Sequence, residues 1–409
     1  MFNRDRWQEI FETIRKNKLR TFLSGFTVAL GIFIFIILFG FGNGLKNQFQ
    51  EFFLDDATNV IFLFPGKTSK PYNGFKSNRR IEFKNDDLSD IKEQFPFFLE
   101  YITPRISRGA VVKYKNEFDN YTTRAVGPAH QFAEKTILMK GRFINQDDIK
   151  NKTKYAVIGR LVAQDLFNQE DPLGKFIDIG NSVFKVVGVF QDDGGDREER
   201  YIYIPYTTRQ LLERSNDKLD QIILAFKPQI GHSGSVLFER KLREFLKKKK
   251  SIDPSDPNGI YIRNVADQLK QNQQFANVLQ LIVTFVGLGT LIAGIIGISN
   301  IMVFVVKERT KELGIRKALG ATPKSVIRMI LQESIFITTI SGYIGLFIGI
   351  FVLKNIGVSL QDYFIKNPYI DTSTALFSTM ILILFGGIAG YIPAKRAAQI
   401  KPIIALRDE

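Results

Sequence analysis

The chain has 409 residues, no cysteine, two histidines and a formal net charge of +15. The lack of cysteine excludes a disulfide framework, a thiolate metal site and a cysteine nucleophile. Four long stretches carry almost no charge, and the segments between them hold nearly all charged residues, which indicates membrane spans joined by aqueous segments. The basic residues gather beside the apolar stretches, so we expect membrane lipid as a partner and no nucleic acid.

The chain begins with a predicted amphipathic helix over residues 1–20. Trp7, Ile10, Phe11 and Ile14 fall on one face of this helix, which we expect to lie along the inner membrane surface. A helix that binds nothing but lipid is the alternative.

The first membrane helix is predicted over residues 21–45. Its uncharged run is long enough to cross a hydrocarbon core of roughly 30 Å. A cleaved signal peptide is the alternative, but this run is longer than the usual apolar region of a signal peptide, and it ends in Gly40, Gly42 and Gly44. We therefore expect an uncleaved span.

Residues 46–277 are predicted to form a mixed α+β domain. Alternating and aromatic-rich runs indicate strands at 60–64, 110–114, 175–179, 184–190, 201–204 and 221–226. Helical patterns occur at 86–95, 159–169, 207–215 and 233–250. Because a strand, a helix and a strand recur near each end, we expect the two ends to form one subdomain, with the middle, about 107–215, inserted as a second.

The rest of the chain contains three further apolar stretches. We expect transmembrane helix 2 at 278–306, a cytoplasmic coupling helix and turn at 307–322, transmembrane helix 3 at 323–353, a short periplasmic loop at 354–372, transmembrane helix 4 at 373–394 and a cytoplasmic tail at 395–409. The predicted fold class is membrane α-helical, with four transmembrane helices and a large α+β extracytoplasmic domain inserted between the first and second.

The orientation follows from the basic residues beside the spans. They are dense before the first span, between the second and third, and after the fourth, but only Lys354 and Lys366 lie in the loop 354–372. Segments rich in Lys and Arg stay in the cytoplasm. Both termini are therefore predicted to be cytoplasmic, and the large domain to be periplasmic, in a bacterial inner membrane.

The connection 307–322 carries the most specific pattern. We expect one helix from Lys307 to Leu319 that stops at Gly320, because glycine suits the left-handed position that ends helices. Thr322 and Pro323 then form the cap and first turn of the next helix. The expected result is a rigid charged helix at the membrane surface, and a solvated positive loop is the alternative.

A family resemblance rests on three segments. From 297 to 349 the sequence reads GISNIMVFVVKERTKELGIRKALGATPKSVIRMILQESIFITTISGYIGLFIG, which resembles the second and third spans of MacB/FtsX-type ABC transporter permeases, with their signature E-R-T-x-E-x-G-I-R-K-A-L-G-A. NKLRTFLSGFTVALGI at 17–32 and IPAKRAAQIKPIIALRDE at 392–409 resemble the first span and the closing segment of the family. Over the outer domain only LGKFIDI and FKVVGVF match the family pattern.

The resemblance implies partners and a site. In this family the loop after the second span docks on a partner ATPase, so the ATPase-coupling residues would be Glu308, Arg309, Thr310, Lys311, Glu312, Gly314, Arg316, Lys317 and Gly320. The implied partners are an ABC-type ATPase subunit, a second permease copy as a homodimer or homologous heterodimer, and a periplasmic adaptor with an outer-membrane channel.

The chain is not expected to be an enzyme. A phosphate-binding loop needs a glycine-rich turn ending in Gly-Lys-Ser/Thr, and the near match at 66–68 has Ile61 where the first glycine belongs and Pro65 before the second. We expect this chain to bind no cofactor, and ATP and Mg to be bound by the separate ATPase subunit.

Two further features concern the spans. Gly345 and Gly349, and Gly386 and Gly390, have the four-residue spacing that lets helices pack closely, either within the chain or in a dimer contact. Glu333 lies inside the third span, where we expect it to reach the interface or to pair with a basic residue such as Arg328.

Together with the predicted spans, the resemblance implies a permease subunit that transmits ATP-driven motion from its ATPase to a periplasmic domain. The expected role is efflux or export of small amphiphiles, peptides or lipoproteins. The alternatives are a non-transporting, FtsX-like signalling permease that regulates periplasmic cell-wall hydrolases, and a membrane sensor.

Overall fold

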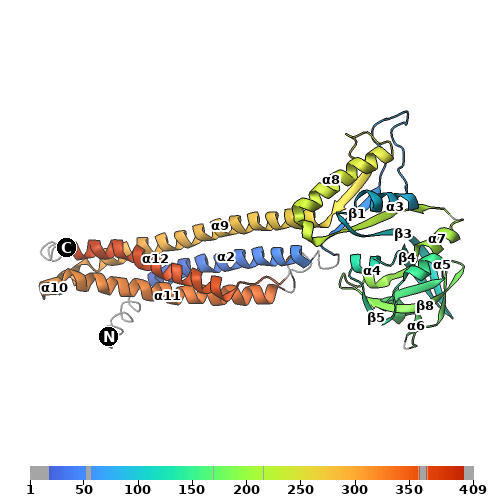
Figure 1. Ribbon diagram of the computed structural model, residues 1–409. Coiled ribbons are helices and arrows are strands. Elements are labelled where there is room, and N and C mark those ends of the chain that lie inside the picture. Colours follow the sequence, from blue (N-terminus) through green and yellow to red (C-terminus); the bar gives the residue numbers. More distant parts are fainter. Residues whose placement is uncertain are drawn as a thin grey trace. The chain divides into compact units, whose positions relative to one another are not determined.

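A computed structural model of the chain describes residues 18–51 and 57–399, apart from 169, 215, 358, 360–364 and 366. The chain divides into two compact units. We call the first, within Met1–Phe49 and Gln273–Glu409, the helical unit, and the second, Gln50–Asn272, the α+β domain (Figure 1). Residues 1–17 of the predicted segment 1–20 and residues 400–409 of the predicted tail 395–409 lie outside the described residues.

The helical unit is built from long apolar helices. They are α2 (Lys18–Glu51), α9 (Val265–Glu308), α11 (Pro323–Ile356) and α12 (Thr372–Gln399), and the short α10 (Thr310–Ala318) lies between α9 and α11 (Figure 1). By length and composition, four helices of the described part of the chain can cross a membrane. Helix α9 begins well before the predicted span at 278, because the polar run 265–277 contains no glycine or proline to stop it.

The helices of this unit pack around α2. Val28, Ile32 and Ile36 of α2 are buried, and they share a cluster with residues of α9, α11 and α12 that includes Leu291, Ile298, Met302, Ile337, Leu346, Leu353 and Ala375. Burial of this apolar face explains why a helix near the start of the chain belongs to the core of the unit.

The α+β domain is organised by one large sheet. Its strand order is β12-β1-β11-β3-β4-β9-β6-β8-β5, and β7 pairs with both β3 and β8. The bounds are β1 (Val60–Pro65), β3 (Leu99–Tyr114), β4 (Glu117–Val126), β5 (Ile137–Gly141), β6 (Tyr155–Gly159), β7 (Phe176–Ile179), β8 (Ser182–Gln191), β9 (Tyr201–Pro205), β11 (Gln221–Phe226) and β12 (Ile260–Asn264). A small second sheet joins β2 (Phe83–Lys84) and β10 (Lys218–Leu219).

Six helices accompany the sheet. They are α3 (Asn85–Gln94), α4 (His130–Ala133), α5 (Gln146–Asn151), α6 (Arg160–Phe167), α7 (Tyr206–Leu212) and α8 (Gly231–Lys249) among the described residues. Short 3-10 segments occur at η1 (Glu198–Arg200) and η2 (Pro228–Ile230). The helices predicted at 86–95, 159–169, 207–215 and 233–250 are confirmed as α3, α6, α7 and α8, with ends that differ by a few residues.

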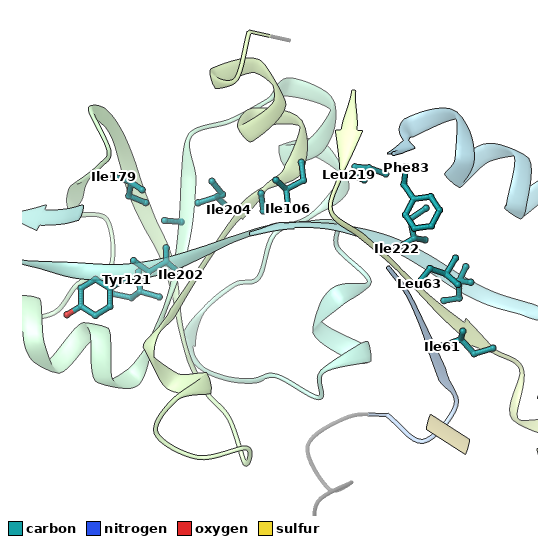
Figure 2. Packing of buried hydrophobic residues seen from close by; sticks show 14 of the residues in the cluster. Ile61, Leu63, Phe83, Ile106, Tyr121, Ile179, Ile202, Ile204, Leu219 and Ile222 are labelled. Carbon is teal, nitrogen blue, oxygen red and sulfur yellow. The ribbon is translucent and has the colours of Figure 1, made fainter. Parts of the chain in front are cut away.

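The main core of the domain extends through both predicted subdomains. Figure 2 shows Ile61 and Leu63 of β1, Ile222 of β11 and Ile106 of β3 among its buried side chains. The cluster continues into the middle part of the domain through Ile158, Ile179, Ile202 and Ile204. The predicted boundary near residue 107 falls inside β3, so the two parts share one sheet and this main cluster of buried side chains.

Candidate functional site: a helix fixed between membrane spans

The turn from α10 into α11 has the predicted chemistry. Gly320 has φ of +100°, the left-handed conformation that glycine adopts without strain. The Thr322 side chain accepts a hydrogen bond from the backbone N–H of Ser325, and Pro323 occupies the first turn of α11. The turn therefore has a fixed geometry.

The start of the connection differs from the prediction of one helix from Lys307. Helix α9 ends at Glu308 and α10 begins at Thr310, with Arg309 between them at φ −92° and ψ 13°. The Thr310 hydroxyl donates to the carbonyls of Lys307, at 2.7 Å, and Val306, at 3.1 Å. Side-chain bonds of this kind compete with the helical ladder and bend helices, which accounts for the break.

Buried apolar contacts fix α10 to three long helices. Leu313 is buried in a cluster with Val306 of α9, Val326 and Ile330 of α11, and Ala394 and Ala397 of α12. Gly314 is also buried. A displacement of α10 is therefore expected to be shared by α9, α11 and α12.

Ion pairs strengthen this attachment. Arg309 reaches Glu312 at 3.1 Å (Nε–Oε2) and Glu333 of α11 at 3.3 Å (Nη1–Oε2). Arg316 pairs with Glu312 at 2.8 Å and lies 2.9 Å from the sulfur of Met329. Glu333 is 5% exposed, so its pairing with Arg309 neutralises a buried carboxylate.

Two sequence interpretations change as a result. Glu333 pairs with Arg309 and not with Arg328, which is exposed. Lys317 donates to the carbonyl of Ala398 at 2.7 Å. Arg309, Arg316 and Lys317, all predicted to form the coupling surface, thus contact other parts of their own chain.

The exposed face of the connection between α9 and α11 carries both charged and apolar side chains. Glu308 and Lys311 are exposed, as is Gly320, and two apolar side chains accompany them. Ile315 is 45% exposed and Leu319 is 84% exposed. Residues four apart lie on the same face of a helix, so Ile315 and Leu319 form an apolar patch beside the charges. Neither Ile315 nor Leu319 is among the predicted coupling residues, because charged residues dominate the sequence of this connection.

The four predicted packing glycines lie at close contacts between helices of the same chain. A Cβ on Gly345 would lie 2.3 Å from the Ala29 carbonyl oxygen of α2, and one on Gly349 would lie 2.8 Å from Ile36. A Cβ on Gly386 would lie 2.8 Å from the Thr338 side chain of α11, and one on Gly390 would lie 2.6 Å from the Ser334 hydroxyl oxygen. Their spacing therefore permits packing within the helical unit.

Gly345→Ala is expected to destabilise the helical unit by about 1–3 kcal/mol, because the added methyl group would meet rigid backbone. Gly289→Ala is the matched control, since nothing lies within 4 Å of its added Cβ. Thermal unfolding in detergent measures both. Equal unfolding temperatures for the two variants would contradict the close contact between α2 and α11.

The α+β domain contains a separate buried polar network around Glu134. Its carboxylate accepts from Arg105 Nη1 at 2.5 Å, Arg124 Nη1 at 2.6 Å and the Tyr203 hydroxyl at 3.1 Å, and lies 3.2 Å from His130 Nε2. Burial alone would raise the pKa of Glu134, but His130 and the two guanidinium groups hold that pKa well below its usual range. Among the described residues, no cluster of His, Asp and Glu has the geometry of a metal site.

The network makes the α+β domain sensitive to acid through His130. Burial lowers the pKa of this imidazole despite the nearby carboxylate. As the pH falls, His130 is therefore protonated in the unfolded chain before it is protonated in the folded chain, which favours unfolding. We expect the unfolding temperature to fall between about pH 7 and pH 5.5, and less so in His130→Gln. Differential scanning calorimetry measures this, with the half-buried His232→Gln as control; an unchanged pH dependence in His130→Gln would contradict it.

Two family models match different parts of the chain. The model of the MacB-like periplasmic core domain matches residues 21–231, and that of the FtsX-like permease C-terminal region matches residues 284–402. The chain belongs to the MacB/FtsX-like permease family. It is therefore an ABC transporter permease with membrane helices and a periplasmic domain.

Curated relatives agree with this family. "Macrolide export ATP-binding/permease protein MacB" of Wolinella succinogenes is 28% identical, and the match covers 98% of this chain and 60% of the relative. The protein of the same name from Bdellovibrio bacteriovorus is 27% identical, and the match covers 98% of this chain and 61% of the relative. The chain thus spans about 60% of the length of these relatives. The solved periplasmic region of MacB from Actinobacillus actinomycetemcomitans is 23% identical, with a TM-score of 0.44, over 54% of this chain and 94% of that one.

Proposed function

We propose that this chain transmits motion from an ABC-type ATPase to its periplasmic domain, for efflux or export of small amphiphiles, peptides or lipoproteins. The observation that carries the proposal is the construction of α10. Its buried side is fixed to α9, α11 and α12 through Leu313. Lys311 and Ile315 of α10 are exposed, as are Glu308 at the end of α9 and Leu319 directly after α10. A rigid element with an exposed charged and apolar face suits the docking of a motor protein.

The proposal includes an arrangement in the membrane. Four helices span the inner membrane, both termini and α10 lie in the cytoplasm, and the α+β domain is inserted between the first and second spans. The basic residues beside the spans support this orientation. A cytoplasmic α10 is what contact with an ATPase requires.

The proposal also includes the partners. The relatives are named ATP-binding/permease proteins and this chain spans about 60% of their length, which supports an ATP-binding part outside the residues of this chain. We infer that ATP and Mg bind to that ATPase and that this chain binds neither. A second permease copy, a periplasmic adaptor and an outer-membrane channel complete the assembly, and the word "export" in the names of the relatives favours transport over signalling.

Purification from the native membrane in mild detergent tests the proposal. Mass spectrometry of the proteins that remain bound is expected to identify an ABC-type ATPase in amounts comparable with the chain. The control is another tagged membrane protein of the same cell, which should not recover this ATPase. The proposal fails if no ABC-type ATPase is recovered under conditions that keep a second transporter of the cell bound to its own ATPase.

A further inference from the structure

A cavity of about 200 Å³ lies in the α+β domain, next to the network around Glu134. Phe62 and Phe64 of β1 form its apolar wall, and its polar wall comes from β3, β4, β11 and β12, with one glutamate after α4 and one from η1. Residues of this wall are neighbours in the sheet: Gln221 stands opposite Arg105, and Arg263 stands opposite Phe62. The cavity is therefore formed by the rigid part of the domain.

Guanidinium groups dominate the polar wall. Arg105, Arg124 and Arg263 line the cavity, together with Glu134 and Glu198. Arg124 contacts both carboxylates, at 2.6 Å and 3.0 Å, and its guanidinium stacks on Tyr201, while the guanidinium of Arg263 stacks on Phe62. These contacts hold the guanidinium groups in place before any ligand arrives.

Arg105 and Arg124 retain donors for a ligand. Arg105 and Arg124 each use Nη1 for their bonds to the glutamates, and their Nε and Nη2 atoms make no hydrogen bond to the described residues. Arg263 takes part in contacts of its own, and its guanidinium carries five N–H donors that it can share with a ligand. Burial lowers the pKa of Arg105, and an anion beside this guanidinium would offset part of that desolvation.

Gln221 supplies the second observation. Its side chain is 3% exposed and lines the cavity, yet neither its amide nitrogen nor its amide oxygen has a hydrogen-bond partner among the described residues. Buried amides are nearly always hydrogen-bonded, so an amide of this kind marks the place of a missing partner.

We propose that this cavity binds one small oxyanion, such as phosphate, sulfate or the carboxylate group of a larger molecule. The anion accepts from the guanidinium groups of Arg105 and Arg263 and from the amide of Gln221, while Glu134 and Glu198 position Arg124 and Arg105. Planar guanidinium groups match the oxygens of such anions in geometry and charge. This site concerns the α+β domain alone and does not depend on the ATPase.

Binding to the full chain in detergent tests the proposal. Equilibrium dialysis with radiolabelled phosphate, and calorimetric titration with sulfate and acetate at constant ionic strength in chloride, are expected to show one saturable site per chain. Tighter binding of phosphate or sulfate would identify a tetrahedral anion as the ligand, and tighter binding of acetate would identify a carboxylate.

Three variants locate the site. Gln221→Leu and Arg263→Gln are each expected to weaken binding about tenfold or more, because hydrogen bonds to charged groups are among the strongest. Lys113→Gln, which removes a charge from an exposed position on β3, is expected to bind like the unmodified chain. Thermal unfolding confirms that each variant is folded, and Arg263→Gln decides the question if Gln221→Leu is not. The proposal is overturned if the unmodified chain binds none of the three anions saturably, or if a folded cavity variant binds as tightly as Lys113→Gln.

Discussion

Arg309→Glu is expected to remove most of the bound ATPase, and a second change, Glu333→Arg, is expected to restore it. The single variant places a third carboxylate beside Glu312 and the buried Glu333. Removal of one partner from a buried ion pair costs about 3–5 kcal/mol, enough to detach α10 from α11. The double variant recreates the pair with reversed charges.

The measurement is the amount of ATPase recovered with each variant, together with its thermal unfolding. Arg328→Glu is the matched control, because it makes the same change of charge at an exposed position of α11. It should retain the ATPase and the unfolding temperature of the unmodified chain. If Arg309→Glu and Arg328→Glu behave alike, the pairing of Arg309 with Glu333 does not hold α10 in place.

Leu319→Asp is expected to reduce ATPase recovery by about tenfold or more without changing the unfolding temperature. Leu319 is 84% exposed, so the folded chain loses no buried contact when it is replaced. A few well-packed residues near the centre of an interface contribute most of its binding energy, and a charge placed in such an apolar contact must be desolvated.

Phe118→Asp provides the control for this change. Phe118 lies on β4 of the α+β domain and is 69% exposed, so the substitution also replaces an exposed apolar side chain with a carboxylate. It should leave ATPase recovery unchanged. Equal recovery with Leu319→Asp and with Phe118→Asp would show that the patch of Ile315 and Leu319 is not part of the docking surface.

The two predictions address different faces of one element. Arg309 and Leu313 connect α10 to its own chain, and Ile315 and Leu319 are exposed. A defect from Arg309→Glu that includes a lower unfolding temperature, and a defect from Leu319→Asp that does not, would separate attachment from docking.

The sequence predicts those parts of the fold that depend on local chemistry. Uncharged runs long enough to cross a membrane indicate the four long helices, and the cap of Thr322 and Pro323 and the left-handed Gly320 follow from residue type alone. The runs at 221–226 and 184–190 are apolar enough to read as strands, and they form β11 and most of β8.

Other features depend on contacts between distant residues. Strand β4 has the polar sequence EFDNYTTRAV, and its strand conformation follows from pairing with β3 and β9. No local sequence pattern predicts this pairing. Arg309 and Glu333 are far apart in sequence, so Arg328, which is nearer to Glu333 along the chain, is the ion-pair partner that the sequence suggests. The pairing with Arg309 becomes evident only when the position of α10 is known. The cavity beside Gln221 likewise needs five strands in register before its side chains meet.

Site-specific photo-crosslinking from position 319 in native membranes tests the central claim most directly. A photoreactive amino acid in place of Leu319 is expected to form a crosslink to an ABC-type ATPase, identified by mass spectrometry, and the same amino acid in place of Phe118 is expected to form none. Crosslinks from position 319 to lipid or to unrelated proteins alone, with the ATPase present in the membrane, would contradict the role of α10 as the surface that receives the motion.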